Sequence, residues 1–148
     1  MINKGLTDYQ GQPEKFLIMT KHPVTVFILT LALVKKFPNH HVRALCAGDK
    51  DRQSYVDAFQ NLNTRALVED DGMGIQSLGI LVSTTGVIGT GYTCTCAFRA
   101  VLFEPDFLEG VKDQVFACIR RMGQSNPQMT CICFVVPGMQ YEQQIFTH

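Results

Sequence analysis

Short apolar runs that alternate with longer segments are the feature that most limits how this chain of 148 residues can fold. Five runs have the length of β-strands, and no hairpin turn joins one run to the next. They are Phe16–Met19, Val42–Cys46, Leu78–Val82, Ala97–Phe103 and Met129–Val136. Strands separated by helix-length segments form βαβ units with parallel strands. The pattern predicts an α/β fold with a central parallel sheet of about five strands and helices on both faces.

Segments of helical length separate these runs. They are Val24–Phe37, Lys50–Asn61 and Leu108–Met122, and a terminal helix is expected to start at Tyr141–Phe146. The first is almost continuously apolar, with lysines only in its last turn, so we expect a largely buried helix. Gly123 is expected to cap the end of the third. Residues 1–14 have no period and predict an irregular N-terminal arm before a single domain over 15–148.

Composition limits the protein class more weakly. The formal net charge of zero argues against a strongly basic coat for nucleic acid, although a local basic stripe is compatible with it. The apolar run from Val24 to Val34 is shorter than the roughly 20 residues needed to span a bilayer. Without a secretory signal, the six cysteines predict free thiols in a reducing compartment.

The carboxyl end of the third predicted strand carries hydroxyls and glycines. Ser83 and Thr84 end the strand, and Gly86, Gly89 and Gly91 follow. Hydroxyls and unhindered backbone amides at such a position can bind oxyanions such as phosphate. A tight crossover turn that needs glycine only for backbone freedom is the alternative interpretation.

Gln114, Cys118 and Arg121 follow at i, i+4 and i+7, so a continuous helix would present all three on one stripe. The alternative is an amphipathic helix whose Arg121 only offsets the helix dipole. Cys94 and Cys96, like Cys131 and Cys133, are spaced i, i+2, whereas zinc pairs are typically spaced C-x₂₋₄-C. We interpret these cysteines as small buried hydrophobes rather than metal ligands.

Together these stretches resemble motifs V and VI of superfamily-two helicases, most closely the Swi/Snf-type DNA translocases. The family patterns run like S-T-x-A-G-G-x-G-x-N-L and Q-A-x-D-R-x-x-R-x-G-Q-x-x-P. The matching residues are Ser83, Thr84, Gly89, Gln114, Arg121, Gly123, Gln124 and Pro127. The turn at Gly48 and the helix containing Arg52 resemble the segment between motifs IV and V more loosely. Cys118 stands where the family has the first of two arginines, Val87 where it has its second glycine, and Gly91 where it has Asn. The resemblance spans Phe16 to Phe146.

The resemblance implies a single RecA-like lobe, the second of the two in such a motor. It implies that Arg121 is catalytic and that Gln114, Cys118, Arg121 and Gly89 face the nucleotide. It implies nucleic-acid contacts by Ser83, Thr84, Gly86, Gly48 and Arg52. DNA and a first lobe, in cis or in trans, are the implied partners, with no membrane. ATP and Mg²⁺ are expected only if a first lobe is supplied, with no cofactor held tightly by this chain. The implied location is intracellular and nuclear, and the implied process is chromatin remodelling.

Glu69–Ser77 faintly resembles a phosphate loop, but Ile75 and Gln76 stand in place of Gly-Lys. We therefore expect no ATP turnover by the chain alone, and we expect Cys118→Arg to raise any activity obtained with a first lobe. Two rival functions remain open. One is a degenerate, non-catalytic module that binds nucleic acid or protein, and the other is an unrelated α/β enzyme with a Gly-rich phosphate turn.

Overall fold

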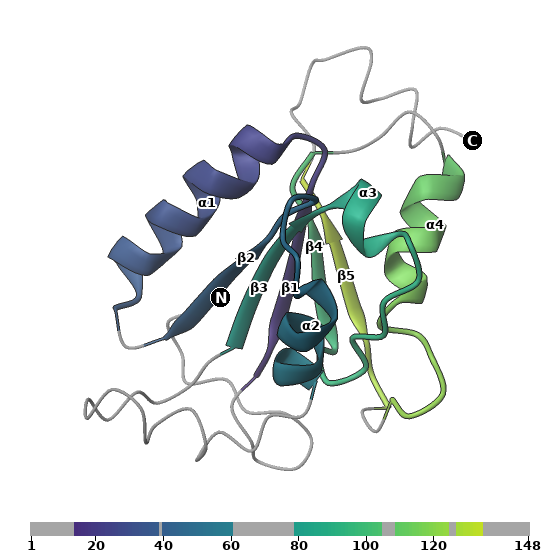
Figure 1. Ribbon diagram of the computed structural model, residues 1–148. Helices are drawn as coiled ribbons and strands as arrows, with labels where there is room; N and C mark the ends of the chain where they lie inside the picture. The colour runs from purple at the N-terminus through teal and green to yellow at the C-terminus, as the bar shows by residue number, and fades with distance from the viewer. Residues whose placement is uncertain (1–13, 39, 61–78, 105–108, 125–126, 135–148) are drawn as a thin grey trace.

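The computed structural model describes residues 14–38, 40–60, 79–104, 109–124 and 127–134. The elements are β1 (Phe16–Thr20), α1 (Pro23–Lys36), β2 (His41–Leu45), α2 (Arg52–Gln60), β3 (Gly79–Thr84), α3 (Thr85–Ile88), β4 (Arg99–Leu102), α4 (Glu109–Ala117) and β5 (Thr130–Cys133). The strands form one sheet in the order β2-β3-β1-β4-β5, and every neighbouring pair is parallel (Figure 1). The predicted α/β class and the predicted parallel sheet are confirmed.

Burial along the strands follows their place in the sheet. Every residue of β1 and β3 is buried, as expected for inner strands of a sheet covered on both faces. The edge strands β2 and β5 are only partly buried. Because the strands are parallel, all their carboxyl ends lie along the same edge of the sheet, perpendicular to the edge strands. We call it the carboxyl edge, and it is where such folds bind ligands.

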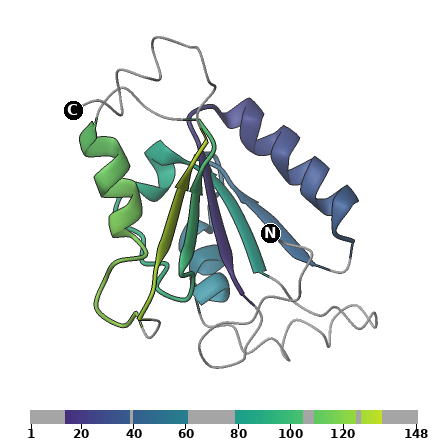
Figure 2. The same cartoon turned by 180° about the vertical axis from the view of Figure 1, so that it is seen from behind.

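The helices cover the two faces unequally. Leu17 and Met19 of β1 contribute to a core with residues of α2, α3 and α4, whereas Phe16 and Ile18 pack in a smaller core with Val26 of α1. Figures 1 and 2 show α1 apart from the other three helices, beside β2 and β3. Helices therefore lie on both faces, as predicted, and among the described residues α1 is the one helix on its face.

The prediction that α1 is largely buried was wrong. Val26 is its only buried residue, while Leu29 and Leu33 are partly buried against the smaller core. The physical reason is that α1 touches the sheet along one stripe, and among the described residues the smaller core in which it packs contains no residue of another helix. No helix of the described residues has both the length and the apolar character needed to cross a membrane.

Glu104, just beyond β4, holds the start of α1. Its carboxylate accepts hydrogen bonds from the Thr25 hydroxyl (2.9 Å), the Lys21 N–H (3.0 Å) and the Thr20 hydroxyl. The His22 N–H also points at it, at 3.4 Å. Although partial burial raises the pKa of Glu104, these hydrogen bonds outweigh that effect and hold the pKa below its ordinary value of 4.5. A carboxylate just beyond β4 thus ties the residues that lead into α1, and one hydroxyl of its first turn, to the sheet.

We expect Glu104→Gln to lower the stability of the protein at neutral pH by about 1 kcal/mol, because hydrogen bonds to a charged carboxylate are weakened. Since the folded pKa is lowered, the ionised carboxylate stabilises the fold fully above pH 4.5, and this contribution is lost as the pH falls through the folded pKa. Urea unfolding between pH 7 and pH 3 should show a smaller acid-induced loss in Glu104→Gln than in wild type. The exposed Asp113→Asn is the control, and equal pH profiles of wild type and Glu104→Gln would contradict the assignment.

Two helices begin or end at other residues than the sequence predicted. The helix expected from Lys50 starts at Arg52, and the helix expected to reach Met122 ends at Ala117. After Ala117 the chain turns more tightly, because the N–H groups of Cys118 and Ile119 bond three residues back instead of four. Gly123 has a φ of +100°, so it does occupy the left-handed conformation predicted for it, six residues after the helix ends. The arm up to residue 13, the segment Glu69–Ser77 and the terminal helix expected at Tyr141–Phe146 lie outside the described residues.

Candidate functional site

The glycine-rich turn after β3 begins with the four-residue helix α3. Thr84 caps it by accepting a hydrogen bond from the Val87 N–H at 3.3 Å. Gly89 ends it, and a Cβ at this position would lie 2.8 Å from the Thr85 carbonyl oxygen. Gly91 follows with a φ of +113°, a conformation that other residues rarely adopt. Two of the glycines are therefore needed for the shape of the turn, which agrees with the alternative interpretation of this stretch.

Two side chains from the second motif bind this turn. Gln114 of α4 donates from Nε2 to the Gly89 carbonyl at 2.6 Å. Arg121 donates from Nη1 to the Gly91 carbonyl at 2.8 Å and to the Thr93 hydroxyl at 3.2 Å. Both side chains are exposed, so they lie on the surface while they hold the backbone of the turn. The structure thus brings three of the predicted residues, Gly89, Gln114 and Arg121, together.

Cys118 is not on this surface. It is 2% exposed, and its thiol donates to the Val115 carbonyl at 2.7 Å. Its neighbour is the buried Cys94, whose N–H donates to the Cys118 carbonyl at 2.9 Å. The pKa of the Cys94 thiol is raised, first by its hydrogen bond to the Cys118 thiol and then by burial. The predicted stripe of three side chains does not form, because α4 ends one residue before Cys118.

Ser83 and Thr84 also face inward. Ser83 is 0% exposed and donates to the Leu45 carbonyl of β2 at 2.8 Å. Thr84 is 8% exposed, and its hydroxyl caps α3. These two hydroxyls join neighbouring parts of the fold, so in this structure they shape the edge of the sheet instead of lining its surface.

The other residues predicted to contact nucleic acid lie at the same sheet edge and are more accessible. Gly86 and Gly48 are exposed, and a Cβ built at either position meets no atom within 4 Å. Arg52 is half-buried at the start of α2. These residues follow β2 and β3, which are neighbours in the sheet, so their positions are compatible with one continuous surface.

Two glutamine side chains hold the loop beyond the turn. Gln60 of α2 donates to the Thr95 hydroxyl at 2.6 Å and accepts from the Cys96 N–H at 3.0 Å. Gln124 donates to the carbonyls of Ala97 (3.1 Å) and Ile119 (3.0 Å). Gln124 is one of the residues that match the second motif, whereas no local pattern marks Gln60, which the sequence reasoning did not single out. Its partners are 35 and 36 residues away.

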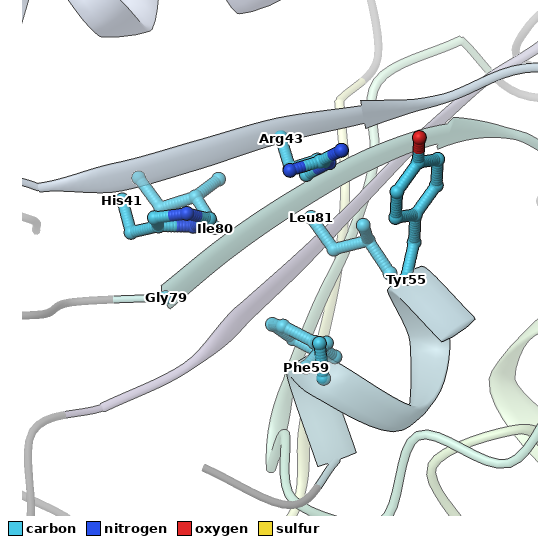
Figure 3. Close-up of a pocket in the computed structure, with 8 residues that line it drawn as sticks. His41, Arg43, Tyr55, Phe59, Gly79, Ile80 and Leu81 are labelled. Carbon is cyan, nitrogen blue, oxygen red and sulfur yellow. The ribbon is translucent and has the colours of Figure 1, made fainter. Parts of the chain in front are cut away.

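A pocket of about 60 Å³ lies elsewhere, between α2 and the strands β2 and β3 (Figure 3). Tyr55 and Phe59 line it from α2, and His41 and Arg43 from β2. The Arg43 guanidinium lies over the Tyr55 ring, 3.9 Å from its centre. The pocket is small beside the roughly 300–1,000 Å³ of sites that enclose a ligand of drug size. None of its lining residues was predicted to act on a nucleotide.

The described residues supply a hydrogen-bond donor for the phosphates of ATP but no cluster of ligands for Mg²⁺. The Arg121 guanidinium matches the geometry of a phosphate group, and both of its hydrogen bonds within the described residues use Nη1, which leaves Nη2 available as a donor. In the part of the chain that the structure describes, no cluster of three or more His, Cys, Asp or Glu side chains could hold a metal ion. The described residues therefore offer a ligand for phosphate and no cradle for the metal.

The fold is that of a RecA-like lobe, the class that the sheet order and the placement of the helices define. Among solved structures, the chain is similar to one described as the C-terminal part of the Fun30 ATPase domain. The TM-score is 0.67 at 22% sequence identity, over 89% of this chain and 38% of that one. This chain thus corresponds to well under half the length of that structure. Comparison of the sequence with family models and with curated proteins finds no match.

Proposed function

We propose that this chain acts as the C-terminal lobe of a Swi/Snf-like, ATP-dependent DNA helicase or translocase and needs a first lobe to work. The observation that carries the proposal is the contact between the two motifs. Gln114 and Arg121 bind the carbonyls of Gly89 and Gly91 over separations of 25 and 30 residues. The likeness of the fold to the C-terminal part of an ATPase domain supports the same function.

On the nucleotide side, Arg121 is the proposed catalytic residue. An arginine that reaches the γ-phosphate stabilises the charge that develops there during phosphoryl transfer. Because Arg121 is also bonded to the glycine-rich turn, a movement of the turn would be passed to its guanidinium. ATP and Mg²⁺ would be held mainly by the first lobe, supplied in cis or in trans.

On the DNA side, the proposed contacts are made by Gly86, Gly48 and Arg52 at the carboxyl edge of the sheet. Backbone amides and an arginine at such an edge hold phosphates and position the strand without reading its sequence. Ser83 and Thr84 would then act indirectly, by fixing the turn. The same proposal implies a nuclear location and a role in chromatin remodelling.

A second candidate is a degenerate, non-catalytic module that still binds nucleic acid or a protein partner. The burial of Cys118, at the place of the family's first arginine, favours it, since a buried thiol cannot supply a positive charge to the nucleotide. The two candidates differ in ATP turnover with a first lobe present, and a module that binds a protein partner would differ in DNA binding as well.

Gly86→Glu tests the DNA surface. The exposed position and the open space around it should let the variant fold, and its charge should weaken DNA binding about tenfold at low salt. Ala58→Glu adds the same charge at an exposed position late in α2, at the end of that helix away from Arg52. It should change affinity less than about twofold. Titration of a labelled duplex at two salt concentrations measures both effects, since phosphate contacts make affinity fall with salt. Equal affinities of wild type and Gly86→Glu would refute the proposed surface.

A further inference from the structure

The side of α1 that faces away from the sheet is apolar. It carries Val24, Phe27, Ile28, Leu31 and Val34, which are 69%, 65%, 60%, 59% and 47% exposed. At 100° per residue, these five side chains fall within an arc of about 120° that is centred nearly opposite the buried Val26. We call these five residues the outer stripe of α1.

The outer stripe is unusual for a solvent-facing surface. It holds five of the nine large hydrophobic side chains that are exposed in the described part of the chain. A helix that is apolar on all sides is normally buried on all sides, and an exposed contiguous apolar patch usually marks an interaction surface. Packing on the sheet explains only the inner side of α1, where Leu29 and Leu33 contact the smaller core.

The charges of α1 lie at one end. The helix contains no acidic residue, and its two basic residues, Lys35 and Lys36, are both exposed in the last turn. An occupant of the outer stripe would therefore meet an apolar surface that becomes positively charged at the carboxyl end of α1.

We propose that the outer stripe docks an amphipathic helix of a partner protein, antiparallel to α1, with acidic residues in its first turn. Apolar residues at i, i+3, i+4 and i+7 would pack on Phe27, Ile28 and Leu31. Acidic side chains are favoured in the first turn of a helix by its dipole, and the antiparallel orientation brings that turn to Lys35, which falls within the arc of the outer stripe, with Lys36 beside it in the last turn. The charges thus select both the orientation of the partner and its sequence.

Two other occupants fit less well. In an antiparallel pair of two copies, the lysines of each α1 would meet the first turn of the other, which has no acidic residue. Helices that lie on membranes carry lysine and arginine along a polar face, whereas the lysines of α1 are confined to its last turn. A partner helix is therefore the occupant that the charges favour.

Two synthetic peptides of equal composition and of about the length of α1 serve as probes. Both have apolar residues at helical spacing, and their glutamates stand in the first turn of one peptide and in the last turn of the other. We expect the first to bind at least tenfold more tightly in fluorescence anisotropy. Phe27→Glu should weaken its binding at least tenfold, whereas Ala32→Glu, exposed on α1 but outside the outer stripe, should change it less than twofold. Replacing Lys35 and Lys36 by Glu should abolish the preference between the peptides.

Thermal melts confirm that each variant is folded before the affinities are compared. Equal binding of the two peptides, no measurable binding of either, or binding that Phe27→Glu leaves unchanged would overturn the proposal. A dimer in sedimentation that Phe27→Glu dissociates would assign the outer stripe to a second copy. Binding to anionic vesicles that the same variant abolishes would assign it to a membrane. Either result would also overturn the proposal.

Discussion

Cys118→Arg is expected to unfold most of the protein at moderate urea concentrations at which wild type stays folded. Cys118 is 2% exposed and packs in the larger core, next to Cys94. An arginine there must either bury an unpaired charge or push the chain after α4 out of place. A buried charge without a partner costs about 3–5 kcal/mol, which is a large share of the roughly 5–15 kcal/mol that stabilises a domain.

The variant was expected from the sequence to raise activity by restoring the family's first arginine. The burial of Cys118 removes the basis for that expectation, since its thiol lies in the core and bonds the Val115 carbonyl instead of being exposed at the surface. Urea unfolding followed by circular dichroism measures the effect. Cys118→Ala, which introduces no charge, should move the midpoint far less. A wild-type midpoint in Cys118→Arg would mean that the side chain at position 118 can turn outward. The variant would then again be expected to raise activity.

The parallel sheet could be predicted because its cause is local. Runs such as Phe16–Met19 are apolar without alternation, and that pattern fits strands covered on both faces. The early end of α4 could not be predicted, because the apolar period continues to Met122. Contacts with a distant segment, among them the bond from the Cys94 N–H to the Cys118 carbonyl, accompany the tighter turn instead.

The residues of the site could be predicted in part from motif matches, but their burial could not, because it depends on contacts between distant segments. Motif matches identified Gln114, Arg121 and Gly89, and the structure brings them together. Spacing alone could not tell that Ser83 faces inward, because that depends on β2 lying beside β3 and supplying the Leu45 carbonyl. The burial of α1 was overestimated for a similar reason. An apolar sequence indicates which side chains of a helix would be buried, but burial also requires a neighbouring element that packs on them.

Arg121→Ala is expected to abolish DNA-stimulated ATP hydrolysis when a first lobe of a Swi/Snf-type ATPase is supplied in trans. An arginine that stabilises the transferred phosphoryl group contributes a factor of about 10³–10⁵ in rate, so any weak activity of the pair should fall below detection. Arg120→Ala is the matched control. Arg120 is the adjacent exposed arginine, and its guanidinium lies near the Cys131 thiol, at 3.7 Å, instead of at the glycine-rich turn.

Phosphate release is measured with DNA present, for this chain alone and for the pair. The chain alone should show no turnover, because its sequence lacks the lysine of a phosphate loop and its described residues contain no acidic cluster that could hold Mg²⁺. Arg121 also holds the turn through Gly91 and Thr93, so thermal stability and DNA affinity are measured beside the rate. A loss of rate with both of these preserved identifies a catalytic role, whereas a parallel loss of all three identifies a structural one. Turnover by the chain alone that vanishes in Arg121→Ala would contradict the need for a first lobe.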